Sequence, residues 1–156
     1  MEAECAQMPD GERQAALRER LDGYLDSGTG SCILRDDACA HIIRQAFLHG
    51  EGTRYELYAW TIMPNHLHVL IQPGEGWDLG RIVPSWKSFT AHAILKTAAG
   101  AAAGPDGSAV WHREYWDRYV RDAGHFQDIL SYIAMNPVRA GICVEPTAWP
   151  HWSGGA

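Results

Sequence analysis

Alternating apolar and polar residues predict two strands in the middle of the chain. Residues 54–63 direct side chains to two faces in turn: Tyr55, Leu57 and Ala59 to one, and Tyr58, Trp60 and Ile62 to the other. This two-residue period is typical of a β-strand. Pro64 and Asn65 favour a turn, and residues 66–72 return as a second strand, so the pair predicts a β-hairpin.

Spacings of three and four residues predict four helical stretches. They cover residues 10–26, 38–49, 78–99 and 125–136. The first is amphipathic, and its apolar face consists of Leu17, Leu21, Tyr24 and Leu25. Asp36 or Asp37 can cap the second helix. Pro84 is expected to split or kink the third helix, and Pro137 to end the fourth.

The remaining segments have weaker patterns. Residues 27–34 indicate a turn and a short extended stretch, residues 100–109 a glycine-rich loop, and residues 151–156 a frayed tail. Residues 111–122 are rich in aromatic and β-branched residues. They are a candidate third strand, although charged residues interrupt the pattern.

Length and composition are those of a single globular domain. The chain has 156 residues, of which 46% are hydrophobic and 21% charged, so one core is expected. The acidic start, MEAECAQMPDGERQ, lacks the order of a secretory signal and no apolar run approaches the roughly 18 residues of a membrane span, so we expect a cytoplasmic protein. The cysteines have no metal-binding spacing and are expected to be free thiols: Cys5, Cys32, Cys39 and Cys143.

The charge balance argues against a broad nucleic-acid-binding surface. The formal net charge is −6. Residues 1–52 carry ten acidic and five basic residues, whereas residues 53–156 carry nine and eight. The excess of acid therefore precedes the candidate site, and any phosphate contact must come from a few placed side chains.

Two histidines interrupt the second predicted strand. His66 and His68 lie two residues apart in NHLHVLIQP, hence on one face, with Cα atoms about 6.5–7 Å apart. Both rings can therefore reach one ion while Leu67, Val69 and Ile71 point into the core. By itself, such a pair is more often two hydrogen-bonded or exposed imidazoles than a metal site.

Tyr132 and Asn136 share one face of the last predicted helix because they are four residues apart. That face lies away from Ile129 and Ile133. A phenol one turn from an amide could supply a nucleophile and an oxygen ligand to the same centre. On spacing alone, the alternative is favoured: Tyr132 packs in the core and Asn136 only ends the helix.

Four blocks together resemble the single-tyrosine HUH transposase family, and most of all its REP-associated tyrosine transposases of bacteria. The blocks are YAWTIMPNHLHVLIQP, WKSFTAH, REYWDRYVRD and YIAMNPVRAGI, followed by WP. The resemblance implies an α+β, ferredoxin-like antiparallel sheet with helices packed on one face. It divides the single domain into a divergent N-terminal helical segment, residues 1–33, and a transposase-like catalytic core, residues 34–152.

The resemblance also implies roles for individual residues. His66, His68 and Asn136 would hold a divalent metal, Mg²⁺ or Mn²⁺, although the ligand types alone also allow zinc. Tyr132 would be the nucleophile. It would nick single-stranded or hairpin DNA by forming a 5′-phosphotyrosine and releasing a 3′-hydroxyl, and the reverse reaction would rejoin strands.

Contacts to DNA are predicted from residue chemistry. Candidates for phosphate contacts are Lys87, Arg113, Arg118 and Arg121, and candidates for stacking on a base are Trp86 and Trp116. Structural roles are at least as good an alternative. The arginines alternate with acidic residues, and most tryptophans pack in cores.

One departure from the family leaves alternatives open. The family opens with a central strand, and no such run precedes the first predicted helix. Either the start is misplaced, or SCILR, residues 31–35, fills the strand, or the copy is decayed. Other functions are a module that binds hairpin DNA or RNA without cutting, and a metal-dependent phosphohydrolase in which Tyr132 is structural. The protein could be a monomer or a homodimer, with Tyr132 acting in cis or in trans.

Overall fold

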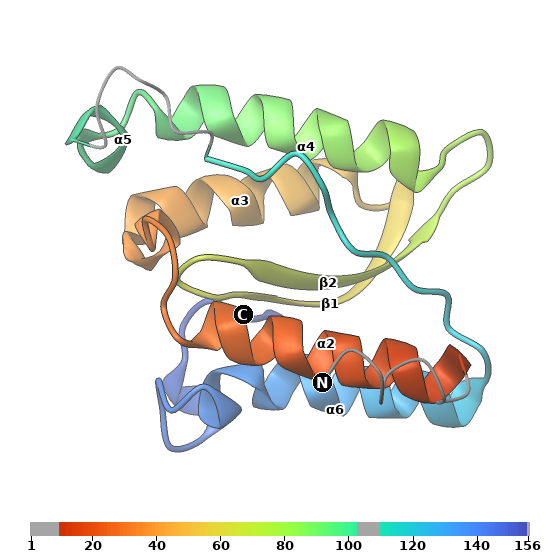
Figure 1. The fold of residues 1–156 in the computed structure, drawn as a ribbon. Helices are drawn as coiled ribbons and strands as arrows, with labels where there is room; N and C mark the ends of the chain where they lie inside the picture. Colours follow the sequence, from red (N-terminus) through yellow and green to blue (C-terminus); the bar gives the residue numbers. More distant parts are fainter. Residues whose placement is uncertain (1–9, 103–109, 156) are drawn as a thin grey trace.

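A β-hairpin lies at the centre of the molecule, between two pairs of helices (Figure 1). The computed structural model describes residues 10–102 and 110–155 of the chain. Strand β1, Tyr55–Ile62, pairs antiparallel with β2, Leu67–Pro73. Helices α3 and α4 pack against each other on one side of the hairpin, and α2 and α6 lie on the other side.

The helices flank both faces of the sheet. They are α2 (Asp10–Asp26), α3 (Asp37–Gly50), α4 (Leu79–Ile94), α5 (Ala98–Ala102) and α6 (Ala123–Arg139), with short 3₁₀ turns at η1 (Ile33–Arg35), η2 (Pro146–Ala148) and η3 (Ser153–Gly155). The predicted α+β class and antiparallel sheet are confirmed, but the helices lie on both faces instead of one. Both faces need cover because Ala59 and Leu70 form a second apolar patch, which packs against α6.

The larger core lies between the hairpin, α3 and α4. Trp60 is opposite Val69 in the register, and Ile62 is opposite Leu67. These side chains pack with Phe47 of α3 in one hydrophobic cluster. Burying side chains of this size contributes roughly 1.5–3 kcal/mol each, so this cluster holds the hairpin against the α3–α4 pair.

Hydrogen-bonded aromatic rings anchor the start of β1. The Tyr55 hydroxyl donates to the Phe47 carbonyl at 2.6 Å, and Trp86 Nε1 donates to the Tyr55 oxygen at 3.0 Å. The Trp86 ring meets Phe47 and Tyr55 edge-on, at centroid distances of 4.9 and 5.2 Å. Gly50 allows the Tyr55 ring to lie against the end of α3, since a Cβ there would be 2.5 Å from the ring.

The signals for helix ends are only partly reliable. The Asp36 carboxylate accepts a hydrogen bond from Cys39 N at 3.1 Å, so Asp36 caps α3. Of the two predictions for Pro84, a split helix is wrong, because α4 continues through it, and no helix kink is described there; the prediction that Pro137 ends a helix is also wrong, because α6 continues to Arg139. The fixed φ of proline suits a helix, and packing can offset the lost N–H bond; Pro137 is buried.

Helix α2 has its polar residues turned inward. The helix itself is confirmed, but Leu17, Leu21 and Tyr24 of its apolar face are exposed to solvent. Asp22 is instead buried, with only 9% of its surface exposed. The surface that α2 covers contains polar side chains, described below, so the helix presents its acidic residues to them.

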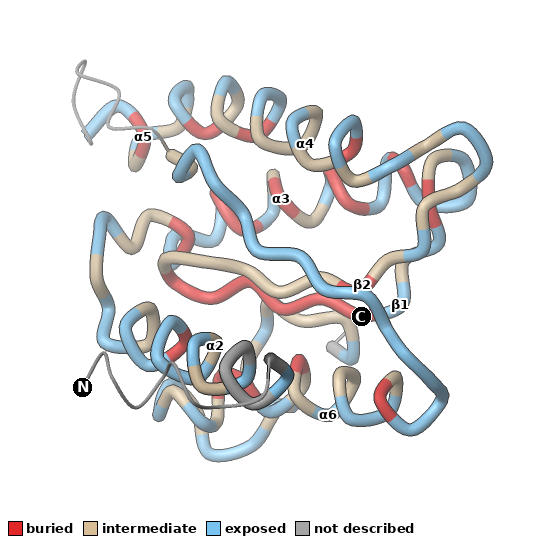
Figure 2. Tube along the Cα trace, turned by 45° about the vertical axis from the view of Figure 1, so that its right-hand side comes forward, coloured by how far each residue is buried: buried red, intermediate tan, exposed pale blue. Residues whose placement is uncertain are grey.

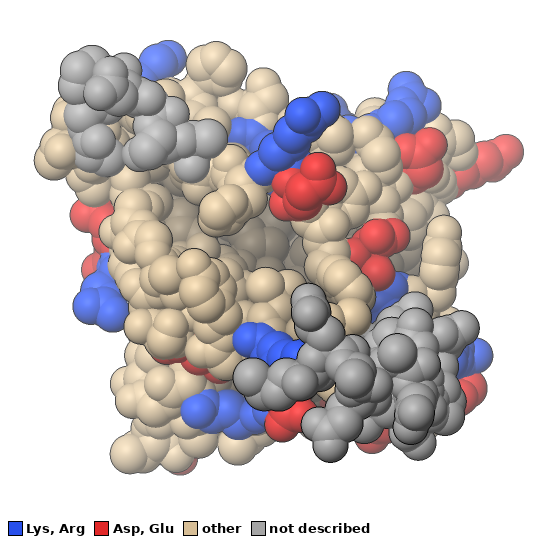
Figure 3. Space-filling model, in the orientation of Figure 1, with Lys and Arg blue, Asp and Glu red and all other residues tan. Residues whose placement is uncertain are grey.

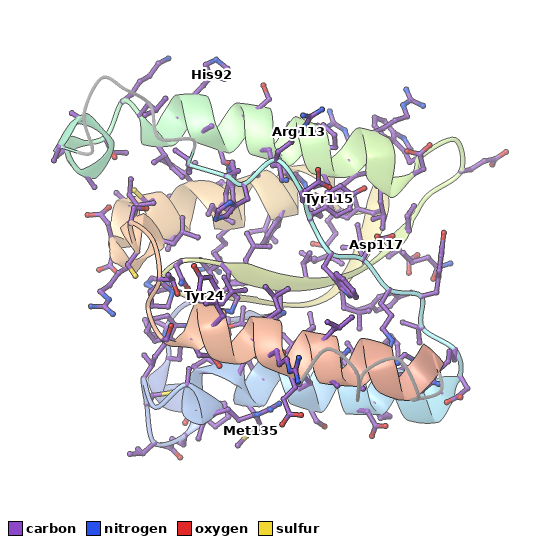
Figure 4. The ribbon with its side chains drawn as sticks, viewed as in Figure 1. Tyr24, His92, Arg113, Tyr115, Asp117 and Met135 are labelled. Atoms are coloured by element: carbon purple, nitrogen blue, oxygen red, sulfur yellow. The ribbon has the colours of Figure 1, made fainter. Side chains whose placement is uncertain are left out.

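Residues 111–122, here called the connector, do not form the predicted third strand. In the described part of the chain, the sheet consists of β1 and β2 alone. The connector runs without helix or strand toward α6, and nearly all of it is exposed (Figure 2). Figure 4 labels Arg113, Tyr115 and Asp117 along the connector. An aromatic-rich segment becomes a strand only where a partner edge accepts its backbone.

Lys87 of α4 attaches the connector to the domain. Its ammonium group donates to the carbonyls of His112, Arg113 and Glu114 at 2.9, 3.2 and 3.3 Å. It also lies 5.3 Å from the centroid of the Tyr115 ring. These carbonyls therefore bond to a side chain instead of a neighbouring strand.

Two other segments differ from expectation. Residues 31–35 supply no strand, because Ile33–Arg35 forms the turn η1. The prediction of a frayed tail is also wrong: Ile62 N donates to His151 O at 2.9 Å, and Trp60 N donates to Ser153 Oγ at 3.1 Å. The tail thereby covers N–H groups on the outer edge of β1 that would otherwise be unpaired.

The described residues include three of the four cysteines and all helices that could be compared with a membrane span. Cys32, Cys39 and Cys143 are free thiols, as predicted, whereas Cys5 lies outside the described residues. No described helix combines the length and the apolar character needed to cross a membrane. Of the predicted loop at residues 100–109, the first three residues belong to α5, and residues 103–109 lie outside the described ranges.

The contact between Gly50 and Tyr55 predicts opposite effects for two glycine substitutions. Gly50→Ala should lower the free energy of unfolding by about 1–3 kcal/mol, because the new methyl group would overlap the buried ring. Gly23→Ala in α2 meets no atom within 4 Å, so it should raise the free energy of unfolding by about 0.5–1 kcal/mol. Urea unfolding measures both changes, and equal effects would contradict the packing described here.

Candidate functional site

Two half-buried histidines face α6 and α2 from the start of β2. His66 directly precedes the strand and His68 is its second residue. Their rings are nearly perpendicular, with centroids 5.0 Å apart. The Nε2 atoms of both rings are buried and have no hydrogen-bond partner. The structure thus brings the predicted pair together, with one ring nitrogen of each histidine left without a partner.

Asn65 determines which nitrogen of His66 carries the proton. Its amide nitrogen donates to the carbonyls of Leu25 and Thr29 at 2.7 and 2.8 Å, so its oxygen is left to accept. His66 Nδ1 lies 2.8 Å from that oxygen and must donate to it. The lone pair of His66 is therefore on Nε2, the arrangement found in metal-binding histidines with an outer hydrogen-bond partner.

Burial keeps both imidazoles neutral. Desolvation, with a smaller contribution from His68, lowers the pKa of His66 to about 3. Burial likewise lowers the pKa of His68, and Asp22 partly opposes this shift. At neutral pH both rings are therefore uncharged, as ligation of a cation requires.

Tyr132 extends from α6 to the same place. Its ring lies edge-on to His68, with 5.4 Å between centroids. Its hydroxyl donates a hydrogen bond to the carboxylate of Asp22 from α2. Burial and this carboxylate raise the pKa of Tyr132, and Arg18 and Arg139 partly oppose the shift. The phenol is thus protonated at neutral pH, with a proton acceptor in contact.

Arginines surround the tyrosine. The guanidinium groups of Arg18 and Arg139 each lie 5.1 Å from the centre of the Tyr132 ring. Burial and the charges of Arg18 and Arg121 lower the pKa of Arg118, so these side chains form a local group of positive charge. Such a group can attract a phosphate to Tyr132 even though the chain has a net negative charge.

Two oxygen atoms complete the set of free acceptors. Asn136 follows Tyr132 by one helical turn and is only 2% exposed, and its Oδ1 has no partner. Asp26 Oδ1 is also without a partner and lies 3.9 Å from His66 Nε2. Burial, followed by the charge of Asp22, raises the pKa of Asp26, whereas Arg139 lowers it.

These nitrogen and oxygen atoms suit the binding of a divalent cation better than they suit hydrogen bonds to one another. Nearly all buried polar atoms in proteins have a hydrogen-bond partner, yet four acceptors of this region have none: His66 Nε2, His68 Nε2, Asn136 Oδ1 and Asp26 Oδ1. Among the described residues, no three His, Cys, Asp or Glu side chains form a ready metal cluster. A cation site that uses the two imidazoles would therefore need a ligand of another type, such as the Asn136 amide.

Two of the residues predicted to contact DNA, Trp86 and Lys87, make contacts within the protein. Trp86 packs in the core and donates to Tyr55, and the ammonium group of Lys87 holds the connector. The arginines at 113, 118 and 121 and Trp116 are exposed on the connector. On the face shown in Figure 3, basic side chains are scattered among acidic ones and form no continuous band. Contacts from these residues to DNA stay predictions.

Four residues of the site were not anticipated from the sequence: Arg18, Asp22, Asp26 and Arg139. A signal for the first three is their spacing of four residues, which places them on one face of α2. Arg139 follows Asn136 by three residues and so continues the face of Tyr132. The apolar face of α2 made this spacing easy to overlook, because it suggested that Leu17 and Leu21 would be buried and the charged residues exposed.

Comparison with known proteins gives consistent matches. Residues 35–136 match the family described as "Transposase IS200 like". The REP-associated tyrosine transposase of Escherichia coli K12 is 26% identical over 112 residues, which cover 70% of this chain and 61% of the relative. A Haemophilus influenzae protein, provisionally given the same name, is 28% identical over 103 residues, covering 64% of this chain and 58% of the relative.

A solved structure has a similar fold. It is that of a REP-associated tyrosine transposase bound to a REP hairpin, with a TM-score of 0.57 and 21% sequence identity. The match covers 74% of this chain and 62% of the other. The chain thus spans about three fifths of the length of the relatives it matches.

Replacing His66 should reduce the loss of stability in acid. Folded His66 stays neutral down to about pH 3, whereas in the unfolded chain it takes up a proton below about pH 6.5. Its contribution to stability is therefore present above pH 6.5 and falls as the pH drops toward 3, by up to about 1.4 kcal/mol per unit. Urea unfolding in EDTA at pH 7 and pH 5 should show a smaller difference for His66→Gln than for the unmodified chain.

The exposed His41 of α3 offers a matched control for this measurement. His41→Gln should keep the difference between pH 7 and pH 5 that the unmodified chain shows. If both variants change that difference equally, His66 is not the buried neutral group described here.

Proposed function

Because the chain belongs to the IS200-like transposase family, we propose that it nicks and rejoins single-stranded DNA through a covalent bond to Tyr132. The observation that carries this proposal is the position of Tyr132: its ring lies 5.4 Å from that of His68, and its hydroxyl contacts Asp22. A phenol, a carboxylate and a histidine pair therefore lie together, which supports these roles for Tyr132 and Asp22.

The cleavage step uses groups of this chain. The Tyr132 oxygen attacks the phosphorus of a DNA phosphodiester, and its proton passes to the Asp22 carboxylate that already accepts its hydrogen bond. The bond from phosphorus to the 3′ oxygen breaks, and that oxygen takes a proton from solvent to become a 3′-hydroxyl. The 5′ end stays attached as a phosphotyrosine, so the energy of the phosphodiester is kept for rejoining.

His66, His68 and Asn136 are proposed to hold a divalent cation, Mg²⁺ or Mn²⁺. Three unpartnered acceptor atoms support this assignment: His66 Nε2, His68 Nε2 and Asn136 Oδ1. A bound cation would polarise a non-bridging phosphate oxygen and orient the scissile bond. Asn65 keeps His66 in the tautomer that leaves Nε2 free.

The proposed substrate is a DNA hairpin with a flanking single strand. The solved relative is bound to a REP hairpin. In this chain, Arg18 and Arg139 beside Tyr132 provide positive charge where the scissile phosphate would lie. Arg118 and Arg121 of the connector continue that charge away from Tyr132, which suits a strand that leaves the site along the connector.

Tyr132→Phe should abolish a covalent adduct with DNA. We expect the unmodified chain, incubated with Mn²⁺ and a labelled hairpin carrying a single-stranded flank, to give a labelled band on a denaturing gel. The variant lacks only the attacking oxygen, so adduct formation should fall at least about 10³-fold. The exposed Tyr24 of α2 provides the control, and Tyr24→Phe should form the adduct normally.

Other outcomes of the same assay would identify a different function. DNA binding without an adduct from the unmodified chain would contradict strand transfer and indicate a binding module. Hydrolysis of the labelled strand that survives Tyr132→Phe would contradict the nucleophile and indicate a metal-dependent phosphohydrolase.

A further inference from the structure

The connector exposes a run of aromatic side chains on its way to α6. Tyr119 is 85% exposed, Trp116 is 54% exposed and Tyr115 is 43% exposed. Among the described residues, none of these three rings is paired with another aromatic ring. A cluster of large apolar groups that faces water is typical of a surface to which another molecule binds.

Hydrogen bonds hold both ends of this aromatic run in place. Before the run, the Trp111 ring donates to a side chain of α4 at 2.8 Å. Lys87 donates to the carbonyls of residues 112–114 at 2.9, 3.2 and 3.3 Å. After the run, the backbone N–H of Arg121 donates to Nδ1 of His125 at 3.1 Å. The rings are therefore presented by a backbone that is fixed on both sides, which reduces the entropy lost when a ligand binds.

Arginines are interleaved with these rings. Arg113 precedes the run, Arg118 lies within it and Arg121 follows it, and all three are exposed. Arg118 lies close enough to Arg18 of α2 for the two charges to affect each other. The guanidinium group of Arg18 is in turn 5.1 Å from the centre of the Tyr132 ring. Positive charge thus continues from the proposed nucleophile to the connector.

A single strand of DNA suits this surface better than a protein does. Exposed rings alternating with arginines are typical of sites for single strands, in which bases stack on the rings and phosphates contact the arginines. The connector also carries Glu114, Asp117 and Asp122. Asp122 is engaged in capping α6, where its carboxylate accepts from His125 N at 2.8 Å. The arginines therefore outnumber the acidic side chains that remain.

We propose that the connector is a stacking surface for the single-stranded flank of the DNA and that Lys87 is the residue that positions it. Bases stack on Trp116 and Tyr119, the two most exposed rings of the connector. Lys87 acts through the carbonyls of residues 112–114 and the ring of Tyr115, and not through a phosphate. The inference rests on the proposed function for the identity of the ligand. It goes further by assigning the surface that binds the flank.

Binding of a fluorescein-labelled strand of about 20 thymidines to the full chain, measured by anisotropy in EDTA, tests the stacking surface. Trp116→Ala and Tyr119→Ala should each weaken binding at least about fivefold, because each removes a ring on which a base stacks. Phe89→Ala is the matched control, since Phe89 of α4 is 59% exposed and lies outside the connector. It should change the dissociation constant by no more than about twofold.

Lys87→Met tests the positioning role, and Lys96→Met removes the same charge from an exposed position just after α4. Lys87→Met should weaken binding of the strand at least about fivefold, whereas Lys96→Met should change it by no more than about twofold. Adding Tyr119→Ala to Lys87→Met should cost less than about twofold more, because the ring is already misplaced. Trypsin should also cut after Arg113 faster in Lys87→Met than in Lys96→Met, since the connector is released.

Three results would overturn the inference. Equal binding by Trp116→Ala, Tyr119→Ala and Phe89→Ala would exclude the stacking surface. Losses from Lys87→Met and Tyr119→Ala that simply add would exclude the positioning role and indicate that Lys87 contacts DNA directly. Ring substitutions that leave DNA binding intact but abolish self-association in sedimentation experiments would show that the surface binds a second copy of the chain.

The covalent adduct is a separate measurement, because binding in EDTA needs neither a cation nor the Tyr132 hydroxyl. A chain that forms the adduct but binds the thymidine strand equally in all variants contradicts this inference alone. A chain whose binding depends on Trp116 and Tyr119 but that forms no adduct contradicts only the proposed function.

Discussion

Burial of two neutral imidazoles beside α2 is the constraint on which the rest of the site depends. Atoms Nε2 of His66 and His68 have no partner in the protein, and unpaired buried polar groups cost about 1–3 kcal/mol each. Asn65 maintains this arrangement by bonding to His66 and to the backbone at the end of α2. The proposed cation would complete these unpartnered nitrogens.

The orientation of α2 follows from this constraint. The helix leaves Leu17 and Leu21 exposed and buries Asp22. On hydrophobic grounds alone the opposite orientation would be better, by roughly 1.5–3 kcal/mol for each leucine fully buried. The observed orientation of α2 is stabilised because Asp22 accepts the hydrogen bond of Tyr132 and Arg18 lies over the same ring. Polar complementarity across the site thus outweighs the apolar stripe.

Patterns that depend on neighbouring residues were good guides to the fold. Period-two alternation located β1, and the Asp36 cap located the start of α3. Patterns whose outcome depends on a partner far away in the sequence were poor guides. The connector has the composition of a strand but no paired edge in the described chain, and Pro137 lies inside α6, where packing keeps the helix intact. Strand pairing and proline tolerance are both decided by what lies next to the segment in space.

The sequence by itself determined the β-hairpin, the common face of His66 and His68, and the common helical face of Tyr132 and Asn136. Each of these follows from the geometry of a single element, in which the spacing of residues sets the direction of side chains. Only the tertiary structure brought Asp22 and Asp26 to these groups, because α2 meets the hairpin through long-range packing. No local period specifies which of two faces of a helix will be buried when one is apolar and the other matches a polar site.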